Sequence, residues 1–342
     1  MSQSPDLHQA FEAAFTLLQA SVEAGKIPGG VLGIHDLKHG RLTRAVGLAQ
    51  KEPDQRDMDV ETWFDLASLT KVIFTTPRIL GLAARGVIDL DAPITSVIPD
   101  FRQYAPDAWE RAVTFRQCLG HRTAFPAVEP IYTYGGDPER LRAFVLQREW
   151  KAGPSVYSDI NFILLGIALE RLGGETIRVM DPGPGFSFTP DPAITAATER
   201  CAWRGRVMVG EVHDENCFAL QGSGHAGLFG TVDAVLDFAT GVLEDDAKGD
   251  EIVKLMRTPL SATRTHGWER PYRGWSGGDH CNASVIGHTG FTGVALWVDV
   301  DNGRTWTLLT NRVHPTRHFD SGILGLRAGV SNAVNAMNGR TA

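Results

Sequence analysis

The sequence predicts an α/β protein in which one antiparallel sheet, built from strands at both ends of the chain, is covered by helices and interrupted by a mainly helical region. Paired β-type runs lie near each end, and helical apolar patterns lie between them. The 342 residues are enough for two domains. We expect a discontinuous α/β sheet domain made of residues 1–78 and 215–342, and a mainly helical region of residues 79–214.

The first predicted element is an amphipathic helix over residues 4–24, which opens at Ser4-Pro5 and stops at Gly25. Two short β-type runs follow at 31–34 and 42–46, and the turn-forming segment between them predicts a hairpin. The apolar residues that set the helix pattern recur at spacings of three and four: Leu7, Phe11, Phe15, Leu18 and Val22.

The far end of the chain predicts a second hairpin. Residues 293–300 and 305–310 are rich in β-forming side chains, and Asn302-Gly303 between them suits a tight turn with positive φ. A terminal helix is expected from Ile323 to Val334.

The middle of the chain carries helical patterns at 71–85, 160–172 and 231–243. Pro77 is expected to kink or interrupt the first of them. Phe186 and Phe188 indicate that the segment 181–192 is an ordered loop rather than a flexible linker.

The charge balance argues against a nucleic-acid partner, because 33 Lys and Arg face 40 Asp and Glu and the net charge is −7. No run of 18 apolar residues predicts a membrane span, and the first 25 residues lack a secretion signal, so we expect a cytoplasmic protein, with a periplasmic one as the alternative if the sequence was trimmed. The 4 cysteines have no C-x-x-C spacing and are expected to be reduced. The sequence leaves the oligomeric state open.

Ser68 and Lys71 form the first candidate for chemistry. They lie three residues apart at the start of a predicted helix, so the hydroxyl and the amine share one face. A serine needs a base to become a nucleophile, and a desolvated lysine can be that base. The alternative is an ordinary helix start with a solvated lysine.

Two further motifs follow in order, Tyr157-Ser158-Asp159 before an apolar helix and His288-Thr289-Gly290 at the end of a β-type run. With Ser68-Leu69-Thr70-Lys71, they make the chain resemble the serine β-lactamase and penicillin-binding protein superfamily. The branch it resembles most contains class C β-lactamases, D,D-peptidases and family VIII carboxylesterases. The similarity extends from about residue 20 to about residue 315.

This resemblance implies a β-lactamase/transpeptidase-like fold, with the active site in the cleft between the sheet domain and an all-α region. It implies that Ser68 is the acylated nucleophile, Lys71 its neighbouring base and Tyr157 the proton relay to the leaving group. The backbone N–H groups of Ser68 and Phe291 would form the oxyanion hole. The chemistry needs no cofactor and no metal.

Two positions depart from the family pattern. Asp159 stands where asparagine is usual, and a carboxylate there would favour the ammonium form of Lys71, which leaves Tyr157 as phenolate or as relay. The alternative is that Asp159 only caps the following helix. His288 stands where lysine is usual, and losing that cation favours uncharged esters or amides.

The predicted function is therefore a serine hydrolase that acts through an acyl-enzyme on small carboxylic esters or amides. β-Lactamase and D,D-peptidase or D-aminopeptidase activity are the alternatives within the same chemistry. A non-catalytic binding protein on the same fold is the alternative of another class.

Three other patterns are interpreted as structural. Ser276 lies in a G-x-S-x-G segment without the flanking strand and helix of a nucleophile elbow, so we expect a glycine-rich loop near the site mouth. The segment 213–216 and His225 lack metal-ligand spacing and are expected to make hydrogen bonds near the cleft. His121 is expected to be structural.

Overall fold

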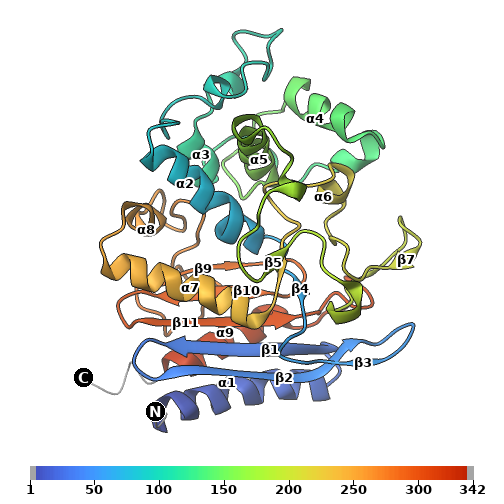
Figure 1. The fold of residues 1–342 in the computed structure, drawn as a ribbon, viewed down its shortest axis with the longest axis vertical. Coiled ribbons are helices and arrows are strands. Elements are labelled where there is room, and N and C mark those ends of the chain that lie inside the picture. The colour runs from blue at the N-terminus through green and yellow to red at the C-terminus, as the bar shows by residue number, and fades with distance from the viewer. Residues whose placement is uncertain (1–4, 337–342) are drawn as a thin grey trace.

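The computed structural model describes residues 5–336 and confirms the predicted α/β fold. Its centre is a six-stranded sheet with the order β3-β2-β1-β11-β10-β9, in which all neighbours are antiparallel (Figure 1). The strands of this sheet are β1 (Gly29–Asp36), β2 (Gly40–Gln50), β3 (Arg56–Asp57), β9 (Ile286–Thr289), β10 (Ala295–Asp299) and β11 (Arg304–Thr310).

Both predicted hairpins are present, as β1–β2 and β10–β11. The turn between β10 and β11 contains Gly303 with a φ of 64°, as expected for its Asn-Gly pair. β1 pairs along its length with β11, with Gly30 opposite Thr310 and Asp36 opposite Arg304. The two ends of the chain therefore meet in the middle of one sheet.

Helices cover both faces of this sheet. α1 (Pro5–Glu23) and α9 (Ile323–Asn335) pack together on one face over an apolar cluster that includes Phe11, Trp297 and Trp306. α7 (Val232–Ala247) packs on the other face against β1, β10 and β11. Trp275 is buried in the cluster beside α1 and α9, and no residue of 274–278 lines the main cavity. The glycine-rich loop therefore packs on the sheet face covered by α1 and α9, and its expected closeness to the site mouth stays a prediction.

The helical region lies above the sheet in Figure 1. Its central helix, α5 (Asp159–Gly173), is buried from Ile160 to Leu169 because apolar residues occupy nearly every side of it. The predicted division of the chain at residues 78/79 and 214/215 stays a prediction. The other α-helices are α2 (Thr76–Ala84), α3 (Phe115–Leu119), α4 (Pro138–Gln147), α6 (Glu215–Ala219) and α8 (Glu251–Arg257).

The helix predicted over 71–85 is interrupted, as Pro77 led us to expect. A π-helical turn, Lys71–Thr75, comes first, with the Thr76 N–H bonded to the Lys71 carbonyl, and α2 then begins with Pro77 in its first turn. Proline is tolerated there because the first N–H groups of a helix have no partner within it.

The segment 181–192 is ordered. It contains β5 (Phe186–Ser187), which pairs with β8 (Phe229–Gly230), and β8 also pairs with β4 (Phe64–Asp65). Phe188 packs edge-to-face on Phe74 with ring centroids 5.0 Å apart. A separate two-stranded ribbon is formed by β6 (Arg200–Cys201) and β7 (Arg206–Val207).

Within residues 5–336, none of the helices combines the length and the apolar character needed to cross a membrane.

Candidate active site

Ser68 lies on a constrained turn directly after β4. The preceding residue, Ala67, has a φ of 45°, a left-handed conformation that non-glycine residues rarely adopt. The buried Asp65 carboxylate stabilises this turn by accepting hydrogen bonds from the N–H groups of Ala67 at 2.8 Å and His213 at 2.6 Å. The turn therefore presents Ser68 at the start of the helical segment that carries Lys71.

The Lys71 ammonium has an acceptor for each of its three hydrogens. Nζ donates to the Ser68 hydroxyl at 2.8 Å and to the His225 carbonyl at 2.9 Å, and forms an ion pair with Asp159 at 2.8 Å. Burial disfavours the charged form, but the Asp159 carboxylate and Tyr157 outweigh it and raise the pKa of Lys71 above its ordinary value. Lys71 is therefore a cation at neutral pH.

Asp159 does not act as a helix cap. α5 begins at Asp159 itself, its N-cap is Ser158, and no side chain caps it. The alternative in which Asp159 only caps the helix is therefore wrong, and the carboxylate faces Lys71 instead.

Tyr157 is half-buried at the cavity, its hydroxyl is close enough to Lys71 and Ser68 for both to act on its pKa, and Lys71 Nζ lies 5.1 Å from its ring centroid. Burial raises the pKa of Tyr157 above its usual value, and the neighbouring Lys71 only partly offsets this. The resting side chain is therefore a neutral phenol, which disfavours the phenolate alternative. The ring packs against His121 with centroids 4.3 Å apart.

His121 has the structural contacts expected of it. Its Nδ1 accepts from the Ser158 N–H at 3.1 Å and lies 3.3 Å from the Asn161 amide nitrogen. His121 thus fixes the start of α5 and the segment that carries Tyr157.

The end of β9 approaches the Ser68 turn closely. A Cβ on Gly290 would lie 2.8 Å from the Leu66 carbonyl oxygen and 3.1 Å from the Ala67 Cβ, so only glycine fits there. This contact brings Phe291, the residue after Gly290, beside the turn. Among residues 5–336, no protein group accepts a hydrogen bond from the backbone N–H of Ser68 or Phe291.

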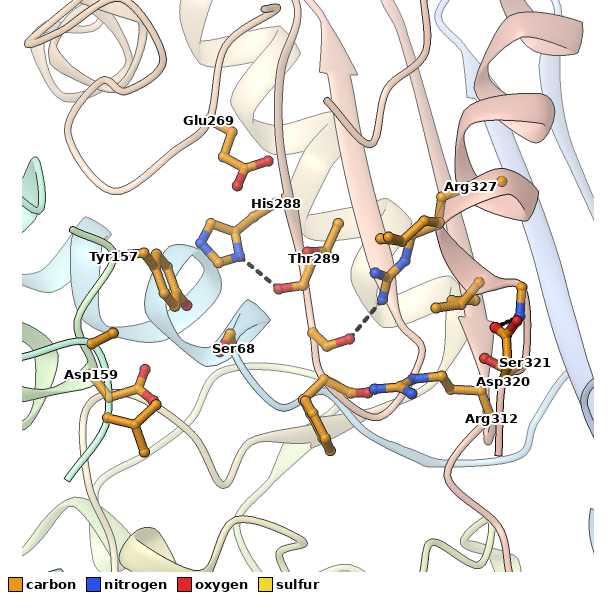
Figure 2. Close-up of a pocket in the computed structure, with 18 of the residues that line it drawn as sticks. Ser68, Tyr157, Asp159, Glu269, His288, Thr289, Arg312, Asp320, Ser321 and Arg327 are labelled. Atoms are coloured by element: carbon orange, nitrogen blue, oxygen red, sulfur yellow. Dashed lines mark hydrogen bonds between the residues drawn. The ribbon is translucent and has the colours of Figure 1, made fainter. Parts of the chain in front are cut away.

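A cavity of about 720 Å³ between the sheet edge and the helical region is lined by Ser68, Tyr157, Asp159, Gly290 and Phe291 among others (Figure 2). Four exposed or half-exposed apolar side chains surround it: Val128, Phe291, Phe319 and Leu324. Its charged lining is balanced, with three cations and three anions: Arg264, Arg312, Arg327, Asp159, Glu269 and Asp320.

His288 lines this cavity as a neutral imidazole. Its Nδ1 lies 2.9 Å from the Thr289 carbonyl oxygen, which only accepts, so Nδ1 carries the proton (Figure 2). Burial and the nearby Arg264 and Lys71 charges hold the pKa of His288 well below its ordinary value. Arg264 is itself paired with Glu269 at 2.9 Å. The cation that lysine would supply at position 288 is absent.

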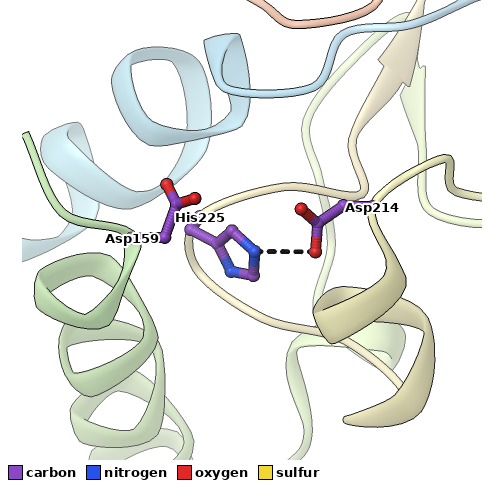
Figure 3. Close-up of side chains that lie close together, drawn as sticks. All are labelled: Asp159, Asp214 and His225. Carbon is purple, nitrogen blue, oxygen red and sulfur yellow. Dashed lines mark hydrogen bonds and ion pairs between the residues drawn. The ribbon is translucent and has the colours of Figure 1, made fainter. Parts of the chain in front are cut away.

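Asp159, Asp214 and His225 offer ligand atoms that lie within 4.8 Å of one another (Figure 3). However, Asp214 Oδ1 already bonds His225 Nε2 at 2.9 Å and accepts from the Cys217 N–H at 2.7 Å. Asp159 is paired with the Lys71 ammonium. The atoms that could bind a metal ion are therefore already engaged, those of Asp214 and His225 in hydrogen bonds and those of Asp159 in the ion pair with Lys71. The group fits a metal ion poorly.

Sequence reasoning brought together Ser68, Lys71, Tyr157, Asp159 and His288, and the structure places all five at this cavity or directly beneath it. It missed two features. The His225 carbonyl acts through the backbone, which no side-chain pattern reveals. The Arg264–Glu269 pair lies in an irregular segment, where spacing gives no signal.

Comparisons with known proteins identify the family. A family model described as Beta-lactamase matches residues 15–328. An N-acetylmuramyl-L-alanine amidase of Bacillus subtilis (strain 168) is 27% identical over 359 aligned residues, which cover 87% of this chain and 80% of the relative.

Two solved structures show the same fold. A class C β-lactamase from Rhodobacter sphaeroides has a TM-score of 0.72 and 18% identity, covering 96% of this chain and 99% of that one. EstCE1, a hydrolase with promiscuous acyltransferase activity, has a TM-score of 0.70 and 20% identity, covering 97% of this chain and 100% of that one. Because the family model spans nearly the whole sequence, the chain belongs to the β-lactamase family, within the serine β-lactamase and penicillin-binding protein superfamily.

Proposed function

We propose that this protein is a serine hydrolase that cleaves small, uncharged carboxylic esters or amides through an acyl-enzyme on Ser68. The observation that carries the proposal is the Lys71 ammonium that donates to the Ser68 hydroxyl at 2.8 Å, with Tyr157 beside both at the cavity. A nucleophile, a fixed cation and a proton relay are thereby in mutual contact.

In acylation, Ser68 Oγ attacks the substrate carbonyl carbon while its proton passes to the Tyr157 oxygen. The phenol proton of Tyr157 passes to the leaving oxygen or nitrogen, so Tyr157 is neutral before and after the step. The Lys71 ammonium stabilises the negative charge that develops on Ser68 Oγ and on the Tyr157 oxygen during these transfers. The carbonyl oxygen, as it becomes an oxyanion, would accept from the N–H groups of Ser68 and Phe291.

In deacylation the proton transfers through Tyr157 run in the opposite direction. Water attacks the acyl carbon and gives a proton to Tyr157, which returns its own proton to Ser68 Oγ as the ester bond breaks. The carboxylic acid leaves and the resting hydrogen bonds re-form. Lys71 remains an ammonium ion in both steps, which agrees with the direction of its pKa.

The preference for uncharged substrates is supported by the cavity. His288 is neutral, so position 288 supplies no cation for a substrate carboxylate, and Arg264 is already paired with Glu269. The name of the amidase relative is in keeping with amide hydrolysis, and the acyltransferase activity of the hydrolase EstCE1 is in keeping with acyl transfer.

Hydrolysis of p-nitrophenyl acetate and butyrate by the wild-type protein and by Ser68→Ala tests the proposal. We expect turnover by the wild type and a loss of at least 1000-fold in the variant, in line with removal of a catalytic nucleophile. A chromogenic cephalosporin hydrolysed faster than both esters would favour the β-lactamase alternative. Ester hydrolysis that survives in Ser68→Ala would contradict the nucleophile.

A cytoplasmic location and the lack of a nucleic-acid partner stay predictions from composition. Cell fractionation and a mobility-shift assay test them.

A further inference from the structure

One of the three acceptors of the Lys71 ammonium is the backbone carbonyl of His225, at 2.9 Å. His225 lies on the loop between α6 and β8, and its side chain is almost fully buried. Both ring nitrogens are bonded, Nδ1 to the Ser223 hydroxyl at 2.8 Å and Nε2 to Asp214 Oδ1 at 2.9 Å (Figure 3). The ring therefore anchors the residue whose carbonyl receives Lys71.

Asp214 is itself fixed. It is the N-cap of α6, where Oδ1 accepts from the Cys217 N–H at 2.7 Å. Burial opposes its charge, but His225, the Cys217 N–H and Lys71 together hold the pKa of Asp214 well below its ordinary value. Asp214 is therefore a carboxylate, and it lies within 4.8 Å of Asp159, the ion-pair partner of Lys71.

The loop backbone is confined on the opposite side. A Cβ on Gly224 would lie 2.5 Å from the Phe162 carbonyl oxygen, and a Cβ on Gly166 would lie 2.5 Å from the Gly224 nitrogen. The Thr75 hydroxyl donates to the Gly224 carbonyl at 2.7 Å. The His225 carbonyl is thus held by α5 and the π-helical turn on one side and by the Asp214–His225 bond on the other.

We propose that Asp214, acting through His225, is a positioning residue that holds one acceptor of the Lys71 ammonium in place and adds a second negative charge beside it. This inference rests on the proposed function, since the placement and charge of Asp214 affect the reaction only if Lys71 acts as a fixed cation during acyl transfer. The other titratable groups that face Lys71 are Tyr157, Asp159 and, further out, His121 and His288.

Asp214 would act on Lys71 in two separate ways. The bond to His225 controls where the carbonyl lies, and misplacing a catalytic group by about 1 Å can cost roughly 100-fold in rate. The charge of Asp214 adds to the negative potential around Lys71, because Asp214 lies within 4.8 Å of the Asp159 carboxylate that pairs with Lys71, and a nearby opposite charge favours the ammonium form. A variant can remove either effect alone.

Asp214→Asn removes the charge and keeps the shape, including an oxygen that can accept from the Cys217 N–H. With p-nitrophenyl butyrate we expect kcat and KM at pH 7 to stay within about threefold of the wild type, because the anchor of His225 is kept. The alkaline limb of the pH–rate profile should move about one pH unit lower. The matched control is Asp250→Asn, which makes the same change at the N-cap aspartate of α8, away from the cavity, and should change neither quantity.

His225→Gln is the second variant, and it decides the question if Asp214→Asn does not fold. It keeps the Asp214 charge but loosens the anchor, so kcat should fall while the alkaline limb stays where it is in the wild type. Wild-type kcat in folded His225→Gln would overturn the positioning role. An unmoved alkaline limb in folded Asp214→Asn would overturn the electrostatic role. Failure of the proposed function looks different, because the wild type itself would then show no hydrolysis that depends on Ser68.

Discussion

Replacing Asp159 with asparagine removes the carboxylate that pairs with the buried Lys71 ammonium at 2.8 Å. Breaking a buried ion pair by removing one partner costs about 3 to 5 kcal/mol. The Asp159 side chain is 29% exposed, so solvent screens part of this interaction. We therefore expect a loss of about 2 kcal/mol, which corresponds to a melting temperature about 4 °C lower for a chain of this size.

The sign of the pH dependence follows from Lys71. Its pKa is raised in the folded protein, so the stabilisation by its charge is complete at neutral pH and is lost only as the pH rises through that elevated pKa. Without Asp159 this loss begins at lower pH. At 1.36 kcal/mol per pH unit, about 2 kcal/mol moves the alkaline limb of kcat/KM down by about 1.5 pH units.

The assay is the pH–rate profile of p-nitrophenyl butyrate hydrolysis, measured on Asp159→Asn and wild type beside their melting curves. If Lys71 acts as a cation, kcat/KM at pH 7 stays within about threefold of the wild type and only the alkaline limb moves. If Lys71 acts as a free amine base, Asp159→Asn should instead raise kcat/KM at pH 7. A tenfold increase there would refute the cationic role.

Three further outcomes follow from the same geometry. Tyr157→Phe removes the proton relay and should lower kcat at least 100-fold in steady-state ester hydrolysis, with little change in KM; near-normal activity would exclude the relay. His288→Lys restores a cation beside the cavity and should raise kcat/KM for a carboxylate-bearing ester relative to its neutral analogue by about tenfold; unchanged selectivity would contradict the substrate argument. Gly290→Ala places a Cβ 2.8 Å from the Leu66 carbonyl oxygen and should displace the Phe291 N–H, with kcat falling about 100-fold; a wild-type kcat in the folded variant would show that this N–H is not needed.

Both hairpins and the main helices could be predicted from the sequence, because each rests on local signals. The Asn302-Gly303 turn and the apolar spacing of α1 are set by neighbours in the chain. The pairing of β1 with β11 joins residues about 280 positions apart, and it was inferred because strands occur at both ends of the chain. The π-helical turn at Lys71 was not predicted beyond an interruption at Pro77, because its geometry depends on tertiary packing.

The candidate site was predicted only in part, for a physical reason. Side chains such as Ser68 and Lys71 leave a pattern in the sequence, whereas the His225 carbonyl is a backbone group that any residue could supply. From the sequence alone, Asp159 can be either a helix cap or a charged partner of Lys71. Only the three-dimensional placement of α5 decides between them.

The central claim is that Ser68 is an activated nucleophile, and its most direct test is reaction with a fluorophosphonate followed by mass spectrometry and peptide mapping. We predict one adduct per chain, on the peptide that contains Ser68, and no adduct in Ser68→Ala. An adduct on Ser276 instead, or no adduct on the folded protein, would contradict the mechanism.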